Sequence, residues 1–156
     1  MNNLPKHILV IPDGDRTYAK QHNMTFEEAY MLAGAQLINI MKWVHLGLNI
    51  SNLTLFALAE YNLTRPIEQV RAILKGGINF FRLLKDDPIL KEVNVRFIGE
   101  LQHCYKLFPK CKSLIQEIQK YKKNTSKQTN VLIAYNGERE LELAIQKCIN
   151  QNKKAI

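Results

Sequence analysis

Residues 7–16 read HILVIPDGDR, and this stretch decides the fold. The apolar run at 8–11 indicates a buried strand that stops at Pro12 and is followed by two carboxylates and an arginine. Gly14 lets the backbone approach a ligand closely, and residues 17–20 can begin a helix at once. Ligands bind at the carboxyl ends of strands in open α/β sheets, and helix N-termini favour anions. The stretch therefore predicts an α/β sheet with an anion site at its edge.

The polar residues after this strand suit a diphosphate. Asp13 offers carboxylate oxygens, which Mg²⁺ prefers, and Arg16 offers a guanidinium that pairs with phosphate. Taken alone, Asp13 and Gly14 fit a plain strand-to-helix turn equally well. Motifs further along the chain decide between these interpretations.

Strand-like and helix-like segments alternate along the rest of the chain. Strands are predicted at residues 7–12, 52–58, 93–98 and 129–135. Helices are predicted to open at the capping box of Thr25 and Glu28, over 67–84, within 101–123 and over 138–151. Repeated β-α units with buried strands favour a parallel sheet with right-handed crossovers. We predict a single α/β domain over residues 1–156, with a central parallel sheet flanked by helices on both faces.

The composition favours an ordinary globular protein of the cytoplasm. A chain of 156 residues can form one core but not two comfortable ones. Cys104, Cys111 and Cys148 give an odd count without paired spacing, which indicates free thiols in a reducing compartment. We recognise no signal peptide, and no apolar run approaches the ~20 residues of a membrane span. We therefore expect a cytoplasmic location.

The net charge of +8, from 22 basic and 14 acidic residues, favours anionic partners. Much of the excess lies in lysines between residues 106 and 127 and in Lys147, Lys153 and Lys154. Charge alone fits diphosphates, an anionic membrane face and nucleic acid. Because aromatic residues do not alternate with the basic ones, we predict no nucleic-acid partner and retain a peripheral membrane contact.

Four segments, in chain order, resemble the signatures of one enzyme family. Residues 7–19 resemble the H-x-x-x-(I/M)-x-D-G-N-x-R-(W/Y)-A signature of the cis-prenyltransferases, the undecaprenyl-diphosphate-synthase-like enzymes. Residues 53–66 are similar to L-T-L-Y-A-F-S-x-E-N-W-x-R-P. Residues 94–100 resemble N-V-R-x-x-x-I-G-D, and residues 134–140 resemble N-Y-G-G-R-x-E. One motif would be weak evidence, whereas four collinear motifs at strand ends are strong evidence.

This resemblance implies a reaction and a site. In the family, an allylic diphosphate loses its diphosphate, the double bond of isopentenyl diphosphate attacks, and loss of a proton leaves a cis double bond. By resemblance, Asp13 and Asn62 would be catalytic. Asp13 would hold the Mg²⁺ cofactor, and Asn62 would lie where the family places a group implicated in deprotonation. The residues expected to bind the substrate diphosphate are Gly14, Asp15, Arg16, Thr17, Tyr18 and Arg65.

The predicted helix at 67–84 has a broad apolar face, which allows two interpretations. It fits ordinary core packing, and it fits the wall of a prenyl tunnel if the resemblance holds. Gly76 and Gly77 inside this helix mark either a kink or a close contact.

The chain departs from the family pattern at important positions. Asp15 replaces the usual asparagine, Tyr61 replaces glutamate and Leu63 replaces tryptophan. Nothing after Tyr135 resembles the family's later R-x-x-x-x-R-x-S-x-F segment or the glutamate that completes metal binding. The resemblance therefore covers only the N-terminal part of the family domain.

Two hypotheses follow. The favoured one is a prenyltransferase that condenses an allylic diphosphate with isopentenyl diphosphate or a second allylic diphosphate, giving a short cis or irregular prenyl diphosphate. The alternative is a non-catalytic homologue that acts as a diphosphate-binding or partner subunit. Under both, isoprenoid diphosphates are the expected ligands, and the chain is expected to form a homodimer or a heteromer with a subunit that supplies the missing segment.

Overall fold

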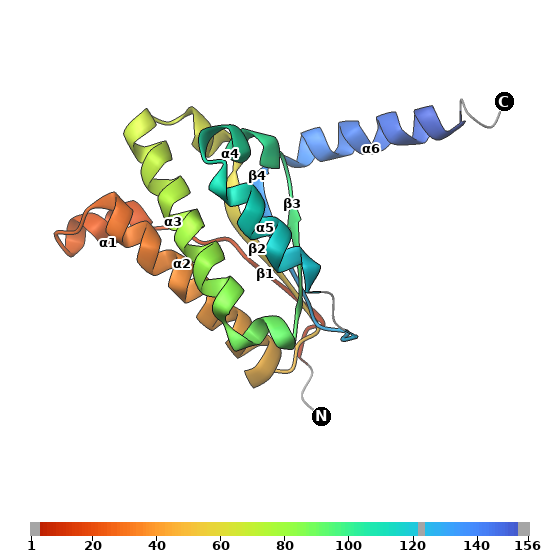
Figure 1. Cartoon of the computed structure of the whole chain (residues 1–156), viewed down its shortest axis with the longest axis horizontal. Coiled ribbons are helices and arrows are strands. Elements are labelled where there is room, and N and C mark those ends of the chain that lie inside the picture. Colours follow the sequence, from red (N-terminus) through yellow and green to blue (C-terminus); the bar gives the residue numbers. More distant parts are fainter. Residues whose placement is uncertain (1–3, 122–123, 153–156) are drawn as a thin grey trace.

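A four-stranded parallel sheet forms the centre of the computed structural model, which describes residues 4–121 and 124–152 (Figure 1). The strands are β1 (His7–Val10), β2 (Asn52–Ala59), β3 (Asn94–Ile98) and β4 (Gln128–Tyr135). Each strand end lies within two residues of its predicted position, so the α/β class and the parallel sheet are confirmed. Lys122, Lys123, Lys153 and Lys154, which contribute to the positive charge, lie outside the described residues.

The described helices also follow the sequence pattern. They are α1 (Asp15–Gln21), α2 (Phe26–Lys42), α3 (Ile67–Asp86), α4 (Leu101–Leu107), α5 (Lys110–Lys120) and α6 (Gly137–Asn152). Short helical turns occupy Trp43–Gly47, Glu60–Thr64 and Pro88–Lys91. The predicted capping box begins α2: the Thr25 hydroxyl accepts the Glu28 N–H at 3.2 Å, and the Glu28 carboxylate accepts the Thr25 N–H at 2.8 Å.

The strand order is β1-β2-β4-β3, and every pair is parallel. Val10 near the end of β1 pairs with Leu55 of β2. Parallel strands end at the same edge of the sheet, so the loops after β1 and β2 are neighbours there. This adjacency brings the first two motifs together.

Helices α1 to α5 form one layer. Helix α3 packs against both α2 and α5, while α1 packs on α2 and α4 packs on α5 (Figure 1). Leu53, Leu55 and Val131 of the sheet are fully buried in the core beneath this layer. The α/β class holds, but the second helix layer expected on the other face is not found within residues 4–121 and 124–152.

The opposite face of the sheet is partly polar, which explains this difference. Leu9 is 55% exposed. Thr54 accepts a 3.3 Å hydrogen bond from the Asn130 amide and makes a 2.8 Å hydrogen bond with the His7 ring. Polar groups that satisfy one another do not require an apolar layer over this face, although all-parallel sheets usually have both faces covered. The apolar run at 8–11 suggests burial on both faces, but only Ile8 and Val10 pack against the core.

Helices α2 and α3 approach each other at glycines. A Cβ added to Gly76 would lie 2.7 Å from the Tyr30 Cβ and 2.8 Å from the Tyr30 carbonyl oxygen. A Cβ added to Gly34 would lie 3.1 Å from the Phe80 Cβ. Helix α3 continues through this point without interruption. The glycine pair in α3 therefore marks a close contact and not a break.

Adjacent glycines in α3 give a matched test of this contact. Gly76→Ala should lower the free energy of unfolding by about 1–3 kcal/mol, because the methyl group overlaps the α2 backbone. Gly77→Ala should raise it by about 0.5–1 kcal/mol, because no atom lies within 4 Å of the new Cβ and alanine favours the helix. Urea titrations of the two variants measure both changes. Equal shifts of the two midpoints would contradict the close-contact interpretation.

His45 is fully buried and links three segments. Its Nδ1 donates to the Ile50 carbonyl at 2.8 Å, and its Nε2 accepts from the Thr129 hydroxyl at 2.8 Å, in the tautomer that pairs both ring nitrogens. Burial lowers the pKa of His45, and Lys127 lowers it further, against a smaller opposing effect of the Ile50 hydrogen bond. The folded state therefore favours the neutral ring.

Acid should destabilise the protein through this histidine. Unfolded His45 binds a proton near pH 6.5, whereas the folded protein binds it only at lower pH, so the free energy of unfolding should fall as the pH drops below about 6.5. Urea titrations between pH 8 and pH 5 measure the fall. In His45→Gln the fall should be smaller. The control His22→Gln, at the exposed end of α1, should retain it, and an unchanged fall in His45→Gln would refute the assignment.

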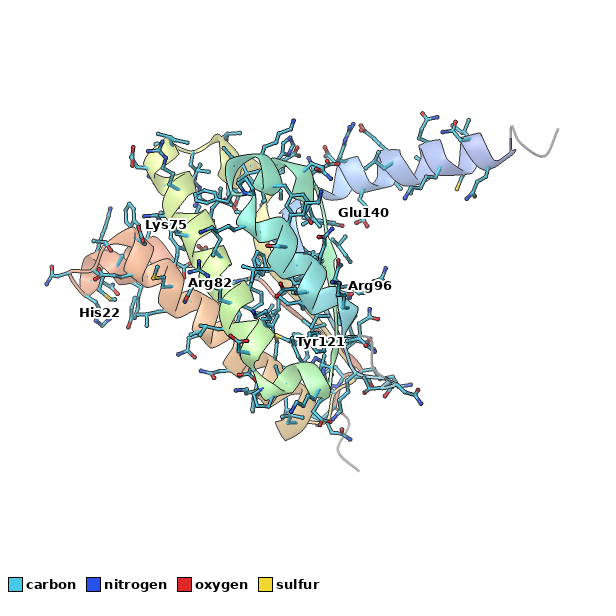
Figure 2. All side chains as sticks on the ribbon, viewed as in Figure 1. His22, Lys75, Arg82, Arg96, Tyr121 and Glu140 are labelled. Carbon is cyan, nitrogen blue, oxygen red and sulfur yellow. The ribbon has the colours of Figure 1, made fainter. Side chains whose placement is uncertain are left out.

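Helix α6 projects away from the rest of the molecule (Figure 1). Beyond its first turn, where Glu140 accepts a hydrogen bond from the Tyr135 hydroxyl, side chains extend outward from it on all sides (Figure 2). Its exposed apolar side chains are Leu141, Leu143, Ile145 and Ile149. None of the helices in the described part of the chain is long and apolar enough to cross a bilayer.

Candidate functional site

A cavity of about 390 Å³ opens at the ends of β1 and β2. Its charged and polar residues are exposed or half-buried, whereas its deepest apolar residues, such as Leu74 and Val131, are buried. The charged and polar lining residues are Asp13, Asp15, Arg16, Tyr30, Tyr61, Asn62 and Arg65. The cavity thus joins a polar entrance to an apolar interior.

The loop after β1 forms one side of the entrance. Gly14 has a φ of 93°, a left-handed conformation that favours glycine, and it precedes α1 directly. Asp13 Oδ1 accepts the Gly14 N–H at 2.7 Å, which fixes the carboxylate against its own turn. The turn places Asp13, Asp15 and Arg16 along the cavity.

Asp15 lies in an environment that disfavours its negative charge. Burial raises the pKa of Asp15, and the negative charge of Asp13 raises it further. Asparagine in this place would avoid both effects. The aspartate therefore costs the folded protein stability at neutral pH.

Replacement of Asp15 should show this cost as a pH dependence. Unfolded Asp15 ionises near pH 3.8 and folded Asp15 at a higher pH, so its charge lowers stability as the pH rises. The melting temperature of Asp15→Asn relative to the parent should therefore increase between pH 4 and pH 7, by about 1–3 °C. Thermal unfolding followed by circular dichroism measures this difference in melting temperature. Asp86→Asn on α3 is the control. A constant difference across this range would show that Asp15 ionises freely.

The loop after β2 forms the facing side. Asn62 Oδ1 accepts the Ala59 N–H at 3.0 Å, so the amide NH₂ is the part of this side chain available to a ligand. Arg65 lies over the ring of Tyr61, with its guanidinium carbon 5.9 Å from the ring centroid. These contacts hold both side chains at the cavity.

The structure brings most of the predicted site residues together. Asp13, Asp15, Arg16, Asn62 and Arg65 all line the one cavity. Gly14, Thr17 and Tyr18 do not line it, and Tyr18 instead stacks on His22 with ring centroids 4.1 Å apart. Sequence reasoning missed Tyr30 and Tyr61 as lining residues. Tyr30 lies outside the four motifs, and α2 brings it to the cavity where this helix packs on α3.

Helix α3 supplies the apolar wall. The α3 residues at the cavity are Ile73, Leu74, Gly76, Gly77, Phe80 and Phe81. Several of them, including Leu74 and Phe81, also belong to the hydrophobic core. Core packing and cavity wall are therefore functions of the same helix face.

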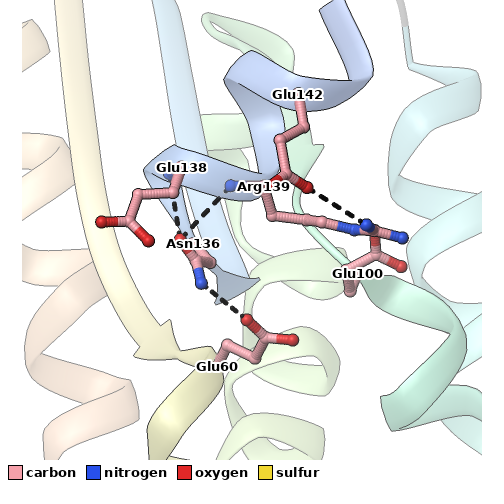
Figure 3. Close-up of polar contacts among 6 residues, drawn as sticks. All are labelled: Glu60, Glu100, Asn136, Glu138, Arg139 and Glu142. Atoms are coloured by element: carbon pink, nitrogen blue, oxygen red, sulfur yellow. Dashed lines mark hydrogen bonds and ion pairs between the residues drawn. The ribbon is translucent and has the colours of Figure 1, made fainter. Parts of the chain in front are cut away.

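The loop after β4 takes no part in this cavity and forms a separate network of polar contacts, which Figure 3 shows. Asn136 Oδ1 accepts the Glu138 N–H at 3.0 Å, and its Nδ2 donates to Glu60 at 2.9 Å. Arg139 pairs with Glu142 at 3.3 Å and with Glu100 at 4.0 Å. This network ties the start of α6 to the ends of β2 and β3. Although this strand end shares the sheet edge, its polar groups stabilise the loops.

The described residues contain no group of three or more His, Cys, Asp or Glu side chains that could hold a metal ion. Cys104 and Cys111 are buried, and burial raises the pKa of each thiol to about 11, so neither is a ready ligand or nucleophile. The carboxylate oxygens at the cavity come from Asp13 and Asp15. One or two carboxylates completed by phosphate and water are the usual protein surroundings of Mg²⁺, so these donors fit that ion.

The sequence model of the family described as "Putative undecaprenyl diphosphate synthase" matches residues 11–156. The chain belongs to the cis-prenyltransferase family. This confirms the resemblance of the four motifs.

Curated relatives are longer than this chain. The "Tritrans,polycis-undecaprenyl-diphosphate synthase (geranylgeranyl-diphosphate specific)" of Pyrobaculum aerophilum is 31% identical over 151 residues, which are 94% of this chain and 62% of that protein. The enzyme of the same name from Methanocaldococcus jannaschii is 30% identical over 161 residues, covering 98% and 54%. The chain thus spans between half and two thirds of the length of these two relatives.

Solved structures share the fold. A lavandulyl diphosphate synthase from Lavandula x intermedia, in complex with dimethylallyl diphosphate, superimposes with a TM-score of 0.81 at 21% identity, over 97% of this chain and 64% of that one. A "probable undecaprenyl diphosphate synthase" from Campylobacter jejuni gives a TM-score of 0.69 at 25% identity, over the same shares. Both similarities confirm the α/β architecture.

Proposed function

We propose that the chain is a Mg²⁺-dependent prenyltransferase that binds an isoprenoid diphosphate in the cavity between α2, α3 and the sheet. The observation that carries this proposal is the cavity itself, with two arginines and two aspartates at one end and an apolar wall at the other. An isoprenoid diphosphate likewise has a charged end and an apolar hydrocarbon tail. The cavity of about 390 Å³ lies near the lower end of the ~300–1,000 Å³ range of ligand sites, which favours a short prenyl chain.

The charged residues would assist departure of the diphosphate. Arg16 and Arg65 approach from different loops and would hold phosphate oxygens through charge-assisted hydrogen bonds. Asp13, with Asp15 beside it, would hold Mg²⁺, which neutralises charge that develops on the leaving diphosphate. The apolar wall excludes water from the reacting carbon.

Asn62 would position the second substrate. Its oxygen is occupied by the Ala59 N–H, and a carboxamide does not take up a proton near neutral pH. We therefore assign Asn62 an orienting function through its NH₂ group, with the proton removed by another group. This role is narrower than the one that the resemblance implies, because it leaves out removal of the proton.

The alternative, a non-catalytic diphosphate-binding subunit, has an observation in its favour. Arg16 and Arg65 are the only arginines lining the cavity in the described part of the chain. Two diphosphates carry several negative charges, and two guanidinium groups beside two carboxylates cannot neutralise them. We propose that the chain alone binds one isoprenoid diphosphate and couples two substrates poorly.

A partner would then complete the reaction. The relatives extend beyond the part that matches this chain, and α6 leads away from the body with apolar side chains exposed. We propose a homodimer, or a heteromer whose other subunit supplies the missing segment. We also retain a cytoplasmic location with peripheral membrane contact as a proposal, and no nucleic-acid partner.

Asp13→Ala tests the proposed function. Geranyl diphosphate should bind the parent chain more tightly with Mg²⁺ than with EDTA, and the variant should lose this difference and any turnover because the metal ligand is gone. Calorimetry measures binding. Product chromatography with labelled isopentenyl diphosphate and dimethylallyl, geranyl or farnesyl diphosphate measures coupling, for the chain alone and for a longer natural form.

Glu68→Gln, on the exposed start of α3, is the control and should behave as the parent. The unfolding curve of Asp13→Ala should stay nearly unchanged, since Asp13 is exposed. Full Mg²⁺ dependence in Asp13→Ala would remove Asp13 from the site. Binding without coupling in every form would favour the non-catalytic subunit, and a parent chain that binds no isoprenoid diphosphate would refute both versions.

A further inference from the structure

Tyr30 lies at the cavity without a role in the reaction described above. It belongs to α2, whereas the charged groups of the entrance come from the loops after β1 and β2. The charges that act on its hydroxyl are those of Arg65, Asp15 and Arg16, in that order. Tyr30 is therefore placed where the two loops face each other.

The hydrogen bonding of Tyr30 leaves its proton available. The guanidinium of Arg65 lies near enough to the Tyr30 hydroxyl to donate a hydrogen bond to it. A guanidinium has donors and no acceptor, so the phenolic oxygen must accept. The Tyr30 O–H is then free to donate to another group, and polarisation by the guanidinium strengthens it as a donor. Burial raises the pKa of Tyr30 above its usual value of 10, which keeps this proton in place at neutral pH.

The backbone of Tyr30 is held in position by α3. The site on Gly76 where a Cβ would stand lies 2.7 Å from the Tyr30 Cβ and 2.8 Å from its carbonyl oxygen. Such close packing fixes the place on α2 from which the Tyr30 side chain extends. A side chain that starts from a fixed place needs less rearrangement when a ligand arrives.

We propose that Tyr30 is a substrate-contacting residue, whose hydroxyl donates a hydrogen bond to an oxygen of the bound diphosphate while it accepts one from Arg65. This inference rests on the proposed function, because it assumes that a diphosphate occupies the entrance. Tyr30 lies on α2, so it adds a third element to the entrance that the two loops form. Its hydroxyl is a neutral donor at an entrance where two arginines face two aspartates.

Tyr30→Phe removes only the hydroxyl and tests the contact. A hydrogen bond to a charged acceptor corresponds to roughly a ten- to hundred-fold change in affinity, so the dissociation constant of geranyl diphosphate should rise by about that factor. Geraniol, which has the same hydrocarbon and no phosphate, should bind both proteins equally. Tyr105→Phe on α4, outside the cavity, is the matched control and should bind as the parent. Thermal unfolding of each variant verifies that the fold is intact.

A second background separates direct contact from support of Arg65. In Arg65→Ala, the further change Tyr30→Phe should still weaken geranyl diphosphate binding, by about three- to ten-fold, because the donor acts on the ligand itself. No further loss in that background would show that Tyr30 acts only through Arg65, and would overturn the inference. Equal affinity of the parent and Tyr30→Phe would also overturn it and leave the proposed function intact. Failure of the parent to bind geranyl diphosphate would instead refute the proposed function.

Discussion

The contact between Gly76 and the backbone of Tyr30 sets the geometry on which the rest of the molecule depends. It determines how closely α2 and α3 approach, because any larger residue at position 76 would push the helices apart. The two helices form much of the layer over the sheet and also enclose the cavity. Packing at protein-interior density transmits such a displacement to neighbouring side chains. The dimensions of the core and of the ligand site are therefore coupled through one glycine.

Local signals in the sequence predict much of this fold. The capping box of Thr25 and Glu28 and the buried strands at 52–58 and 129–135 depend on neighbouring residues, and the structure has them at the predicted places. The number of helix layers depends on which strand face meets water, and a run of apolar residues such as 8–11 does not encode this. Its Leu9 is largely exposed, whereas Val10 packs against the core.

The candidate site shows the same division between local and distant information. Asp13 and Arg65 are predicted from the sequence because each lies in a motif at a strand end, and both line the cavity. Tyr30 lies outside the four motifs, and its position at the cavity follows from a helix crossing between residues far apart in sequence. Thr17 and Tyr18 match the family pattern by position, but the first turn of α1 carries them away from the cavity. A helix of seven residues is too short for its sequence pattern to predict which of its side chains face the cavity.

Helix α6 has a consequence for how the stability of the chain should be understood. A helix of 16 residues without tertiary packing is marginal in water, since most helical stability in proteins comes from a buried face. The network around Asn136 secures only its first turn. Its outer turns are therefore expected to exchange amide hydrogens as an independent unit of low stability, separately from the sheet. Anything that covers Leu141 and Ile145 would shift this local equilibrium by mass action, so the order of α6 becomes a measure of whether the chain has found a partner.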